Sequence, residues 1–311
     1  MENLGVIASR RFGQYQLATR VGEGGMAEIF RAEYVDERGE LRTAILKLLQ
    51  KGADEEVTDL FVLEADLMNL LHHPNLVARL EVGEAGGRAF IAMEDLFGGD
   101  LRTLMSSHHQ SSDGVPLEVT LHVICSVLRG LASFHQARGR GGHPLALIHG
   151  DVNPSNVFLS VEGEVKLGDF GVATIDGIGA GVQLPPGMAL GKRHYFSPEI
   201  VAGGERCQAD DLWAIGVMLY ELVVGYRPFD GEDDLRLFQS IAAAKVDFPP
   251  GLVDEAMKKI LQKALSRASK NRYPTAGALC GALVRYQLDE DCQLAPGAFE
   301  GYLAEKLGVI A

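Results

Sequence analysis

The sequence of 311 residues lacks paired cysteines and any excess of basic charge. Its four cysteines, Cys125, Cys207, Cys280 and Cys292, are far apart and have the spacing of neither a zinc site nor a small disulfide scaffold. Asp and Glu outnumber Lys and Arg by 42 to 29, and the net charge of -13 repels nucleic acid and anionic membranes. We therefore expect a protein of the reducing cytoplasm that has no nucleic-acid partner.

Long hydrophobic runs are also missing. Residues 1–15 contain no apolar run of signal-peptide length, so we do not expect export. The most apolar segment, Leu212 to Gly225, is too short to cross a bilayer and contains Glu221, which favours a helix buried in a core. We expect no membrane partner. With 47% hydrophobic residues, the chain can still build one large core or two lobes.

Two kinds of hydrophobic pattern divide the chain. Short alternating runs broken by glycine occupy residues 15–93 and predict antiparallel strands, interrupted by one helical pattern at residues 54–73. The predicted buried stripe of that helix consists of Leu60, Leu63, Leu67 and either Leu70 or Leu71. From Gly98 onward long helical patterns dominate, and the hydrophilic residues 106–114 are expected to form a loop. The sequence thus predicts an α+β protein, with an antiparallel sheet and one helix followed by a mainly helical part.

Two features of the first part point to an anionic ligand. In the stretch VGEGGMAEIF, Gly22, Gly24 and Gly25 let backbone amides approach a triphosphate, and the alternation that follows is that of a strand. A plain glycine hairpin is the alternative. Lys47 lies in a buried-looking strand and needs a counter-charge, which Glu64 of the predicted helix would supply. The alternative is a snorkelling lysine beside an unrelated surface glutamate.

Further short motifs follow in a characteristic order. They are HPNLV from His73, MEDL from Met93, HGDVNPSN from His149, DFG from Asp169, SPE from Ser197, DLWAIG from Asp211 and NRY around Arg272. With these motifs the chain resembles the protein kinase superfamily, in particular the eukaryotic-like (Hanks-type) serine/threonine kinases of bacteria, from about Tyr15 to Leu288. The resemblance implies a bilobal kinase fold: an N-terminal extension (1–14), a sheet-based N-lobe with one helix (15–97), a mainly helical C-lobe (98–290) and a tail helix (291–311).

The resemblance also implies roles for individual residues. Lys47, held by Glu64, would bind the α- and β-phosphates of ATP, and Asp151 would accept the proton of the substrate hydroxyl. Asn156 and Asp169 would ligate Mg²⁺, with Mn²⁺ as an alternative ion. The other expected nucleotide contacts belong to the glycine loop, the sheet, the hinge and the second lobe: Gly22, Glu23, Gly24, Gly25, Ile29, Ile45, Met93, Glu94, Leu96, Asp100 and Phe158.

Four further matches are expected to have structural roles. Glu199 and Arg272 resemble the buried ion pair that anchors the activation segment of kinases. Asp211 resembles the helix aspartate that supports the catalytic loop. His149 is expected to pack in this loop and not to act as an acid or base.

Gly150, in HGDVNPSN, departs from the family pattern. The family usually has an arginine at this position, which pairs with a phosphate on the activation segment. Residues 172–196 contain a single Ser or Thr, Thr174, so the usual phosphate acceptor is missing along with its receptor. We therefore expect activity that does not depend on phosphorylation of the activation segment.

Asn153 is the second departure, because most family members have at this position a lysine that contacts the transferred phosphate. Losing that contact costs about 1.5 to 3 kcal/mol, or roughly a ten- to hundredfold loss of rate. Lys192 or Arg193 would supply the missing charge; as the alternative, both are solvated loop cations.

These observations predict an ATP- and Mg²⁺-dependent protein kinase that acts on Ser or Thr hydroxyls of protein substrates, with lowered activity. A nucleotide-binding pseudokinase that serves as a scaffold or allosteric partner is the alternative, which Gly150 and Asn153 favour. A small-molecule kinase of related fold is disfavoured by the SPE motif at Ser197. The tail, residues 296–308, is expected to cap the second lobe, with contact to a partner as the alternative. The sequence does not predict the oligomeric state.

Overall fold

The computed structural model describes residues 11–23, 26–111, 114–139, 141–171, 173–175 and 190–307. These residues divide into two compact units. The first unit contains the described residues up to His72, together with Val77–Asp95. The second contains His73–Leu76 and the described residues from Leu96 onward. The domain limits expected from the sequence stay a prediction.

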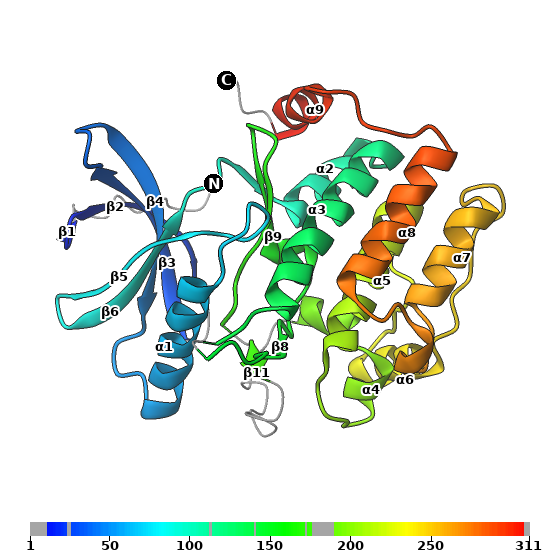
Figure 1. Cartoon of the computed structure of the whole chain (residues 1–311), viewed down its shortest axis with the longest axis horizontal. Helices are drawn as coiled ribbons and strands as arrows, with labels where there is room; N and C mark the ends of the chain where they lie inside the picture. Colours follow the sequence, from blue (N-terminus) through cyan, green and yellow to red (C-terminus); the bar gives the residue numbers. More distant parts are fainter. Residues whose placement is uncertain are drawn as a thin grey trace. The chain divides into compact units, whose positions relative to one another are not determined.

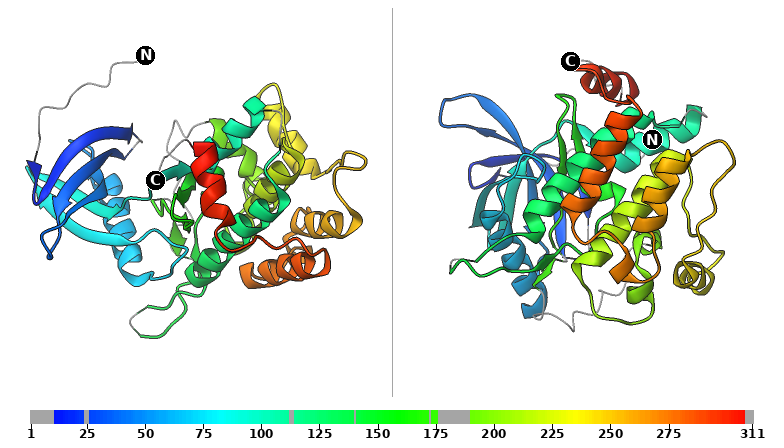
Figure 2. Two further views of the ribbon diagram at one scale, coloured as in Figure 1. Left: turned by 90° about the horizontal axis from the view of Figure 1, so that it is seen from above. Right: turned by 45° about the vertical axis from the view of Figure 1, so that its right-hand side comes forward.

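Antiparallel strands build the first unit, in the spatial order β1-β2-β3-β4-β6-β5 (Figure 1). Their bounds are Arg11–Phe12 (β1), Tyr15–Glu23 (β2), Ala27–Val35 (β3), Leu41–Leu49 (β4), Arg79–Ala85 (β5) and Arg88–Glu94 (β6). Successive side chains point to opposite faces, and one face forms a hydrophobic core around Phe30, Leu46 and Phe90. The strands, blue to cyan, curl into a twisted sheet (Figure 2). The predicted antiparallel sheet is confirmed.

The helix of the first unit, α1, spans Glu55–Leu70, and the carboxylate of Asp54 caps its first turn. Its buried residues are Phe61, Glu64, Ala65, Leu67 and Met68. The predicted leucine stripe is confirmed at Leu67 and at Leu71, the alternative to the exposed Leu70, whereas Leu60 and Leu63 are only half-buried. The physical reason is that the helix is rotated so that Glu64 reaches Lys47 of β4.

Helices build most of the second unit. Their bounds are Leu101–Ser111 (α2), Leu117–His135 (α3), Pro198–Val201 (α4), Gln208–Val224 (α5), Asp234–Ala243 (α6), Glu255–Ala264 (α7), Ala276–Asp289 (α8) and Ala298–Leu307 (α9), with short 3₁₀ turns at Pro154–Asn156 (η1), Leu190–Tyr195 (η2) and Ser269–Asn271 (η3). The long helix α3 packs against α5 and α8 (Figure 1). By length and composition α3 could cross a membrane, but 67% of its most apolar part is buried inside the protein, as in a core helix. The predicted α+β class and the order of a sheet followed by helices are confirmed.

Short strands of the second unit frame the HGDVNPSN loop. They are Gly98–Asp100 (β7), Leu147–Ile148 (β8), Val157–Ser160 (β9), Val165–Leu167 (β10) and Thr174–Ile175 (β11), in the sheets β10-β9-β7 and β11-β8. The side chain of Asn75 donates a hydrogen bond to the carbonyl of Val165 at 2.9 Å and so ties His73–Leu76 to this unit. The approach requires Gly130 of α3, because a Cβ there would lie 2.4 Å from the carbonyl oxygen of Asn75.

The hydrophilic residues expected as a loop at 106–114 belong in part to α2, which continues to Ser111. Helical spacing and burial are shared by Leu101, Leu104, Met105 and His108. The hydroxyl of Tyr302, on α9, hydrogen-bonds to Nε2 of His108. The rings of the two residues stack, with their centroids 5.7 Å apart. The loop prediction was wrong for residues 106–111, because a distant part of the chain covers this polar stretch.

The tail helix α9 packs on α2 and β7 (Figures 1 and 2). Phe299 and Leu303 are 3% and 0% exposed. The ring centroid of Phe299 lies 4.6 Å from that of His122 on α3. The tail therefore covers one end of the second unit, as expected. A partner contact through the tail stays a prediction.

Candidate active site

Lys47 of β4 and Glu64 of α1 form a buried ion pair inside the first unit. The Lys47 Nζ donates to Oε1 and Oε2 of Glu64 at 2.8 and 2.7 Å. Their side chains are only 9% and 2% exposed. The two hydrogen bonds offset the cost of removing both charges from water. The structure thus brings the two residues together, and the snorkelling alternative is wrong.

Three apolar residues expected at the nucleotide share a sheet face with Lys47. Ile29 stands directly opposite Lys47, and Ile45 stands directly opposite Met93. Because opposite residues, and residues two apart on one strand, point to the same side, all four side chains lie on one face. Ile29, Ile45 and Met93 are half-buried. An apolar platform beside an ammonium group suits a ligand with a planar ring and an anionic end.

The glycine loop lies only partly within the described residues. Gly22 and Glu23 end β2, and Gly22 pairs with Ile29 of β3 in the ladder. The exposed carboxylate of Glu23 lies 2.7 Å from a guanidinium nitrogen of Arg20. Gly24 and Gly25 lie outside the described residues. The expected placement of the loop between two strands is confirmed.

The expected hinge starts at the end of β6. Glu94 accepts the N–H of Ala78 at 2.6 Å through its carboxylate and donates its own N–H to the carbonyl of Ala78 at 3.0 Å. The next residue, Asp95, accepts a hydrogen bond from Arg31 of β3 at 3.1 Å, with a second contact of 2.7 Å. Sequence reasoning missed this ion pair, although strand alternation places Arg31 on the face of Ile29. Leu96, half-buried, belongs to the second unit.

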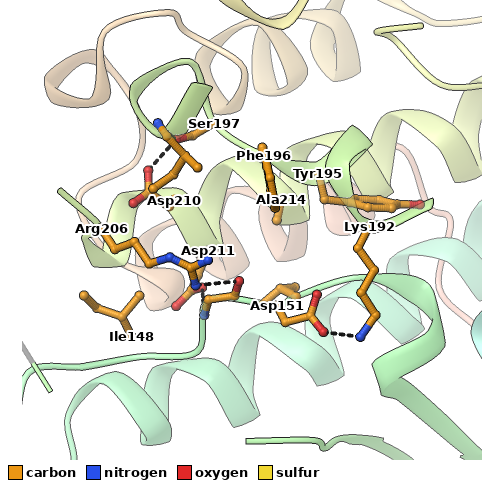
Figure 3. Close-up of a pocket in the computed structure, with 13 residues that line it drawn as sticks. Ile148, Asp151, Lys192, Tyr195, Phe196, Ser197, Arg206, Asp210, Asp211 and Ala214 are labelled. Atoms are coloured by element: carbon orange, nitrogen blue, oxygen red, sulfur yellow. Dashed lines mark hydrogen bonds and ion pairs between the residues drawn. The ribbon is translucent and has the colours of Figure 1, made fainter. Parts of the chain in front are cut away.

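Asp151, the expected base, lies in the second unit between β8 and η1 and is 7% exposed. Its Oδ1 accepts Nδ2 of Asn153 at 3.0 Å, and its Oδ2 accepts Nδ2 of Asn156 at 2.8 Å. The ammonium of Lys192, from η2, forms an ion pair with the same Oδ2 (Figure 3). Donors on both oxygens hold the carboxylate in one orientation.

Asn153 is buried and works within the loop. Its Nδ2 also donates to the carbonyl of Asp151 at 2.9 Å, and its Oδ1 accepts the N–H of Ser155 at 3.0 Å, which caps η1. These bonds make Asn153 an orienting residue for Asp151. Of the two cations expected to supply a charge, Lys192 reaches Asp151, whereas Arg193 pairs with Asp234.

The expected metal ligands lie on adjoining backbone segments. Asn156 gives both hydrogens of its amide to Asp151, at 2.8 Å to the carbonyl and 2.8 Å to the carboxylate. Its side chain therefore presents Oδ1, the kind of oxygen that Mg²⁺ binds. Gly168 donates its N–H to the carbonyl of Asn156 at 3.0 Å. Asp169, the next residue in the sequence, therefore lies close to the backbone of Asn156.

These residues fit a cation that is shared with phosphates. Within the described ranges no group of three or more His, Cys, Asp and Glu side chains could hold a metal by itself. A carboxylate and an amide oxygen are instead the small protein contribution that Mg²⁺ takes when phosphate and water complete its shell. Asp169 has a left-handed backbone with φ of 61°, which aspartate tolerates better than most residues.

Aromatic packing fixes the residue after Asp169. The ring of Phe170 stacks on Phe134 at 5.4 Å and meets His149 edge-on at 5.5 Å. His149 Nε2 lies 3.2 Å from the carbonyl of Gly168. Burial lowers the pKa of His149 and favours the neutral ring. The expectation that His149 packs in the loop is confirmed.

Asp211, in the first turn of α5, holds the start of the loop. Its Oδ2 accepts the N–H of His149 at 2.9 Å and Nε2 of His135 at 2.8 Å, and its Oδ1 accepts the N–H of Gly150 at 2.9 Å. Burial acts to raise the pKa of Asp211, but the hydrogen bonds from His135 and the backbone outweigh it and hold the pKa below its ordinary value. The expected support of the loop by Asp211 is confirmed.

Glu199 and Arg272 form the second expected ion pair. Arg272 Nη2 donates to Glu199 Oε2 at 2.6 Å, and the N–H of Ser269 donates to Oε1 at 3.0 Å. Burial opposes ionisation, but the hydrogen bond from Arg272 prevails and lowers the pKa of Glu199. The segment that this pair was expected to anchor lies largely outside the described residues. Thr174 belongs to β11, and its backbone is described but its side chain is not.

Asp100 and Phe158 face each other as partners of β7 and β9. The Asp100 Oδ1 accepts the N–H and the hydroxyl of Thr103, both at 2.7 Å, at the start of α2. One oxygen of the residue expected at the ribose therefore stabilises a helix end. Phe158 is half-buried.

Sequence reasoning missed Arg206, which lies just before α5. Its Nη1 donates to the carbonyl of Gly150 at 3.1 Å, and both residues line a pocket next to Asp151 and Lys192 (Figure 3). The sequence alone offers no signal for this contact, because no spacing relates the two positions.

Comparison with known proteins agrees with this geometry. The family model described as "Protein kinase domain" matches residues 15–282. Over 95% of its length the chain is 34% identical to "Tyrosine-protein kinase MasK" of Myxococcus xanthus, of which it covers 47%. It is 30% identical to "Serine/threonine-protein kinase PrkC" of Bacillus subtilis (87% of the chain, 40% of the relative). It is 31% identical to "Serine/threonine-protein kinase PknL" of Mycobacterium tuberculosis (86% and 64%).

The chain thus spans less than two thirds of the length of these relatives. The match nevertheless covers both units and every motif on which the resemblance was based. The predicted bilobal kinase fold is confirmed. The chain belongs to the protein kinase family, among the eukaryotic-like (Hanks-type) kinases of bacteria.

Proposed function

We propose that this chain is a protein kinase that transfers the γ-phosphate of ATP, with Mg²⁺, to Ser or Thr hydroxyls of protein substrates. One observation carries the proposal: the carboxylate of Asp151 is held in one orientation by Asn153, Asn156 and Lys192. A fixed acceptor can align a hydroxyl for in-line attack and take its proton, which is most of what the protein contributes to this reaction.

The other groups divide the remaining work. ATP would supply the phosphoryl group, and Mg²⁺ would neutralise its charge. Lys47, fixed by Glu64, would hold the α- and β-phosphates, and Asn156 and Asp169 would hold the cation. We propose Mn²⁺ as a second ion that these oxygens accept.

Lys192 is the cation that offsets the absence of a lysine at position 153. Its ammonium sits on the acceptor carboxylate, where it could shift to the transferred phosphate as negative charge develops there. An ammonium delivered from η2 is less tightly positioned than one built into the loop itself, so we propose that the rate is lowered but not abolished.

The choice of acceptor hydroxyl is supported by the relatives. The names of PrkC and PknL describe serine/threonine kinases, whereas that of MasK describes a tyrosine kinase. We propose Ser and Thr, and the test must include tyrosine peptides. The net charge of -13 supports the further proposal of a protein without a nucleic-acid partner, and the widely spaced cysteines support that of a cytoplasmic protein.

Independence from activation-segment phosphorylation is part of the proposal. Gly150 cannot bind a phosphate through a side chain, and Thr174 is the only Ser or Thr among residues 172–196. The Thr174→Ala variant should keep full activity. A stoichiometric, activating phosphate on Thr174 would contradict this part.

The deciding experiment is Mg²⁺-dependent transfer of labelled γ-phosphate to the chain itself and to Ser, Thr and Tyr peptides. Asp151→Asn and Asp169→Ala should abolish transfer, which also excludes a contaminating kinase, and Asp289→Asn, at an exposed position of α8, should not. No transfer by the wild type, with ATP still raising the Tm, would overturn the proposal in favour of a nucleotide-binding scaffold.

A further inference from the structure

The peptide before Asp151 is an unusual point of the loop. Gly150 has a φ of +74°, in the left-handed region that glycine adopts without strain. The same freedom lets a glycine peptide rotate easily, and rotation of this peptide would swing the carboxylate of Asp151. A loop with glycine here therefore needs other groups to fix the peptide.

Both polar groups of Gly150 are held from the start of one helix. Its N–H donates to Oδ1 of Asp211 at 2.9 Å, and its carbonyl accepts Nη1 of Arg206 at 3.1 Å. Arg206 directly precedes Cys207, the N-cap of α5, and Asp211 lies in the first turn of that helix. Because α5 is buried along most of its length, it is a rigid base for both contacts.

We propose that Arg206 is a positioning residue for the catalytic base: its guanidinium fixes the carbonyl of Gly150 and thereby the direction of Asp151. This inference rests on the proposed kinase function. Arg206 approaches Asp151 from one side and Lys192 from the other (Figure 3). Lys192 and the two asparagines orient the carboxylate, while Arg206 and Asp211 orient the backbone that carries it.

The size of the effect follows from the donor. A hydrogen bond from a charged group shifts an equilibrium on the order of ten- to a hundredfold. Misplacing the acceptor affects the transition state more than the binding of nucleotide, so the loss should fall on kcat. An arginine that merely supported the fold would lower the Tm and leave the kcat of the folded fraction unchanged.

The test compares Arg206→Ala and Arg206→Lys with a matched control. Arg138 Nη1 donates to the carbonyl of Gly142 at 2.7 Å, and Gly142 also has a left-handed φ of +76°, but this loop contains none of the site residues. We expect Arg206→Ala to lower kcat about tenfold or more with KM for ATP within about twofold of wild type. Arg206→Lys should restore part of kcat, and Arg138→Ala should change neither constant.

A second readout does not need activity. Amide hydrogen exchange at residues 149–153 should accelerate in Arg206→Ala and stay unchanged in Arg138→Ala, because only the first variant frees the Gly150 peptide. Wild-type kcat and wild-type exchange in Arg206→Ala would overturn the inference. If the wild type transfers no phosphate, the proposed function fails, and exchange alone still decides: acceleration supports the fixing of this peptide by Arg206, and no change refutes it.

Discussion

Replacing Glu64 by alanine should leave the ammonium of Lys47 buried without its carboxylate. The pair has N–O distances of 2.7 and 2.8 Å and side chains that are 9% and 2% exposed, so little water can take over the lost contacts. Removing one partner of such a pair costs about 3 to 5 kcal/mol. Lys47→Met should cost a similar amount, because it leaves the buried carboxylate of Glu64 without the ammonium of Lys47.

The double variant Lys47→Met/Glu64→Leu distinguishes the causes. If the cost of each single change is a stranded charge, removing both charges should bring the loss close to zero, since apolar residues of similar volume replace buried ion pairs at little cost. Two single losses of about 4 kcal/mol would add to about 8 kcal/mol, so the expected coupling is at least several kcal/mol. Additive losses would refute the reasoning.

The assay must report on the first unit. The single tryptophan, Trp213, lies in α5 of the second unit, so its fluorescence follows the unfolding of that unit. Amide exchange in β4 and α1 instead gives the free energy of opening around the pair. In the phosphate-transfer assay all three variants should lose about a hundredfold or more in kcat, because Lys47 is either absent or no longer held by Glu64 in the position that binds the phosphates.

Three further outcomes are expected. Lys192→Met should lower kcat about ten- to a hundredfold and Lys192→Arg less, in the same assay; an unchanged rate would remove Lys192 from the site. The folded pKa of Asp211 is depressed, so its contribution to stability is complete above about pH 4, the unfolded value, and is lost as pH falls through the folded pKa. The free energy of unfolding, measured in urea, should therefore change in parallel for wild type and Asp211→Asn above about pH 4 and fall more steeply for wild type below it. Parallel curves down to pH 3 would contradict this. Phe299→Ala should cost about 3 to 5 kcal/mol and lower the Tm, whereas Lys306→Ala at the edge of α9 should not; equal melting of both would mean that the tail is not packed.

The local elements could be predicted from the sequence because each is set by its own pattern. The alternating runs between Tyr15 and Met93 predict strands, since a period of two is the spacing at which successive side chains point to opposite faces of a sheet. The spacing from His149 to Asn156 brings the acceptor and the amide into one short loop, where Asn156 reaches Asp151 without help from distant residues. Composition likewise predicted a globular protein, because 47% hydrophobic residues are enough for one large core or two lobes.

The rotation of helices was decided only by the tertiary structure. The leucines of α1 predicted an apolar stripe, yet Leu60 and Leu63 are only half-buried and Glu64 lies inward, where its carboxylate meets the buried ammonium of Lys47. The sequence did not predict the helical end of α2 either, because the polar His108 is buried only through packing with Tyr302, far along the chain.

Around Asp151, too, the sequence predicted the loop, and only the tertiary structure decided which cations contact it. The sequence named Asp151 and its loop, and it left Lys192 and Arg193 as equal candidates for the missing charge. Only the fold places Lys192 on the carboxylate and brings Arg206 to the carbonyl of Gly150. Such contacts join residues about 40 to 60 positions apart, and long flexible side chains carry no periodicity that would fix their partners before the core has packed.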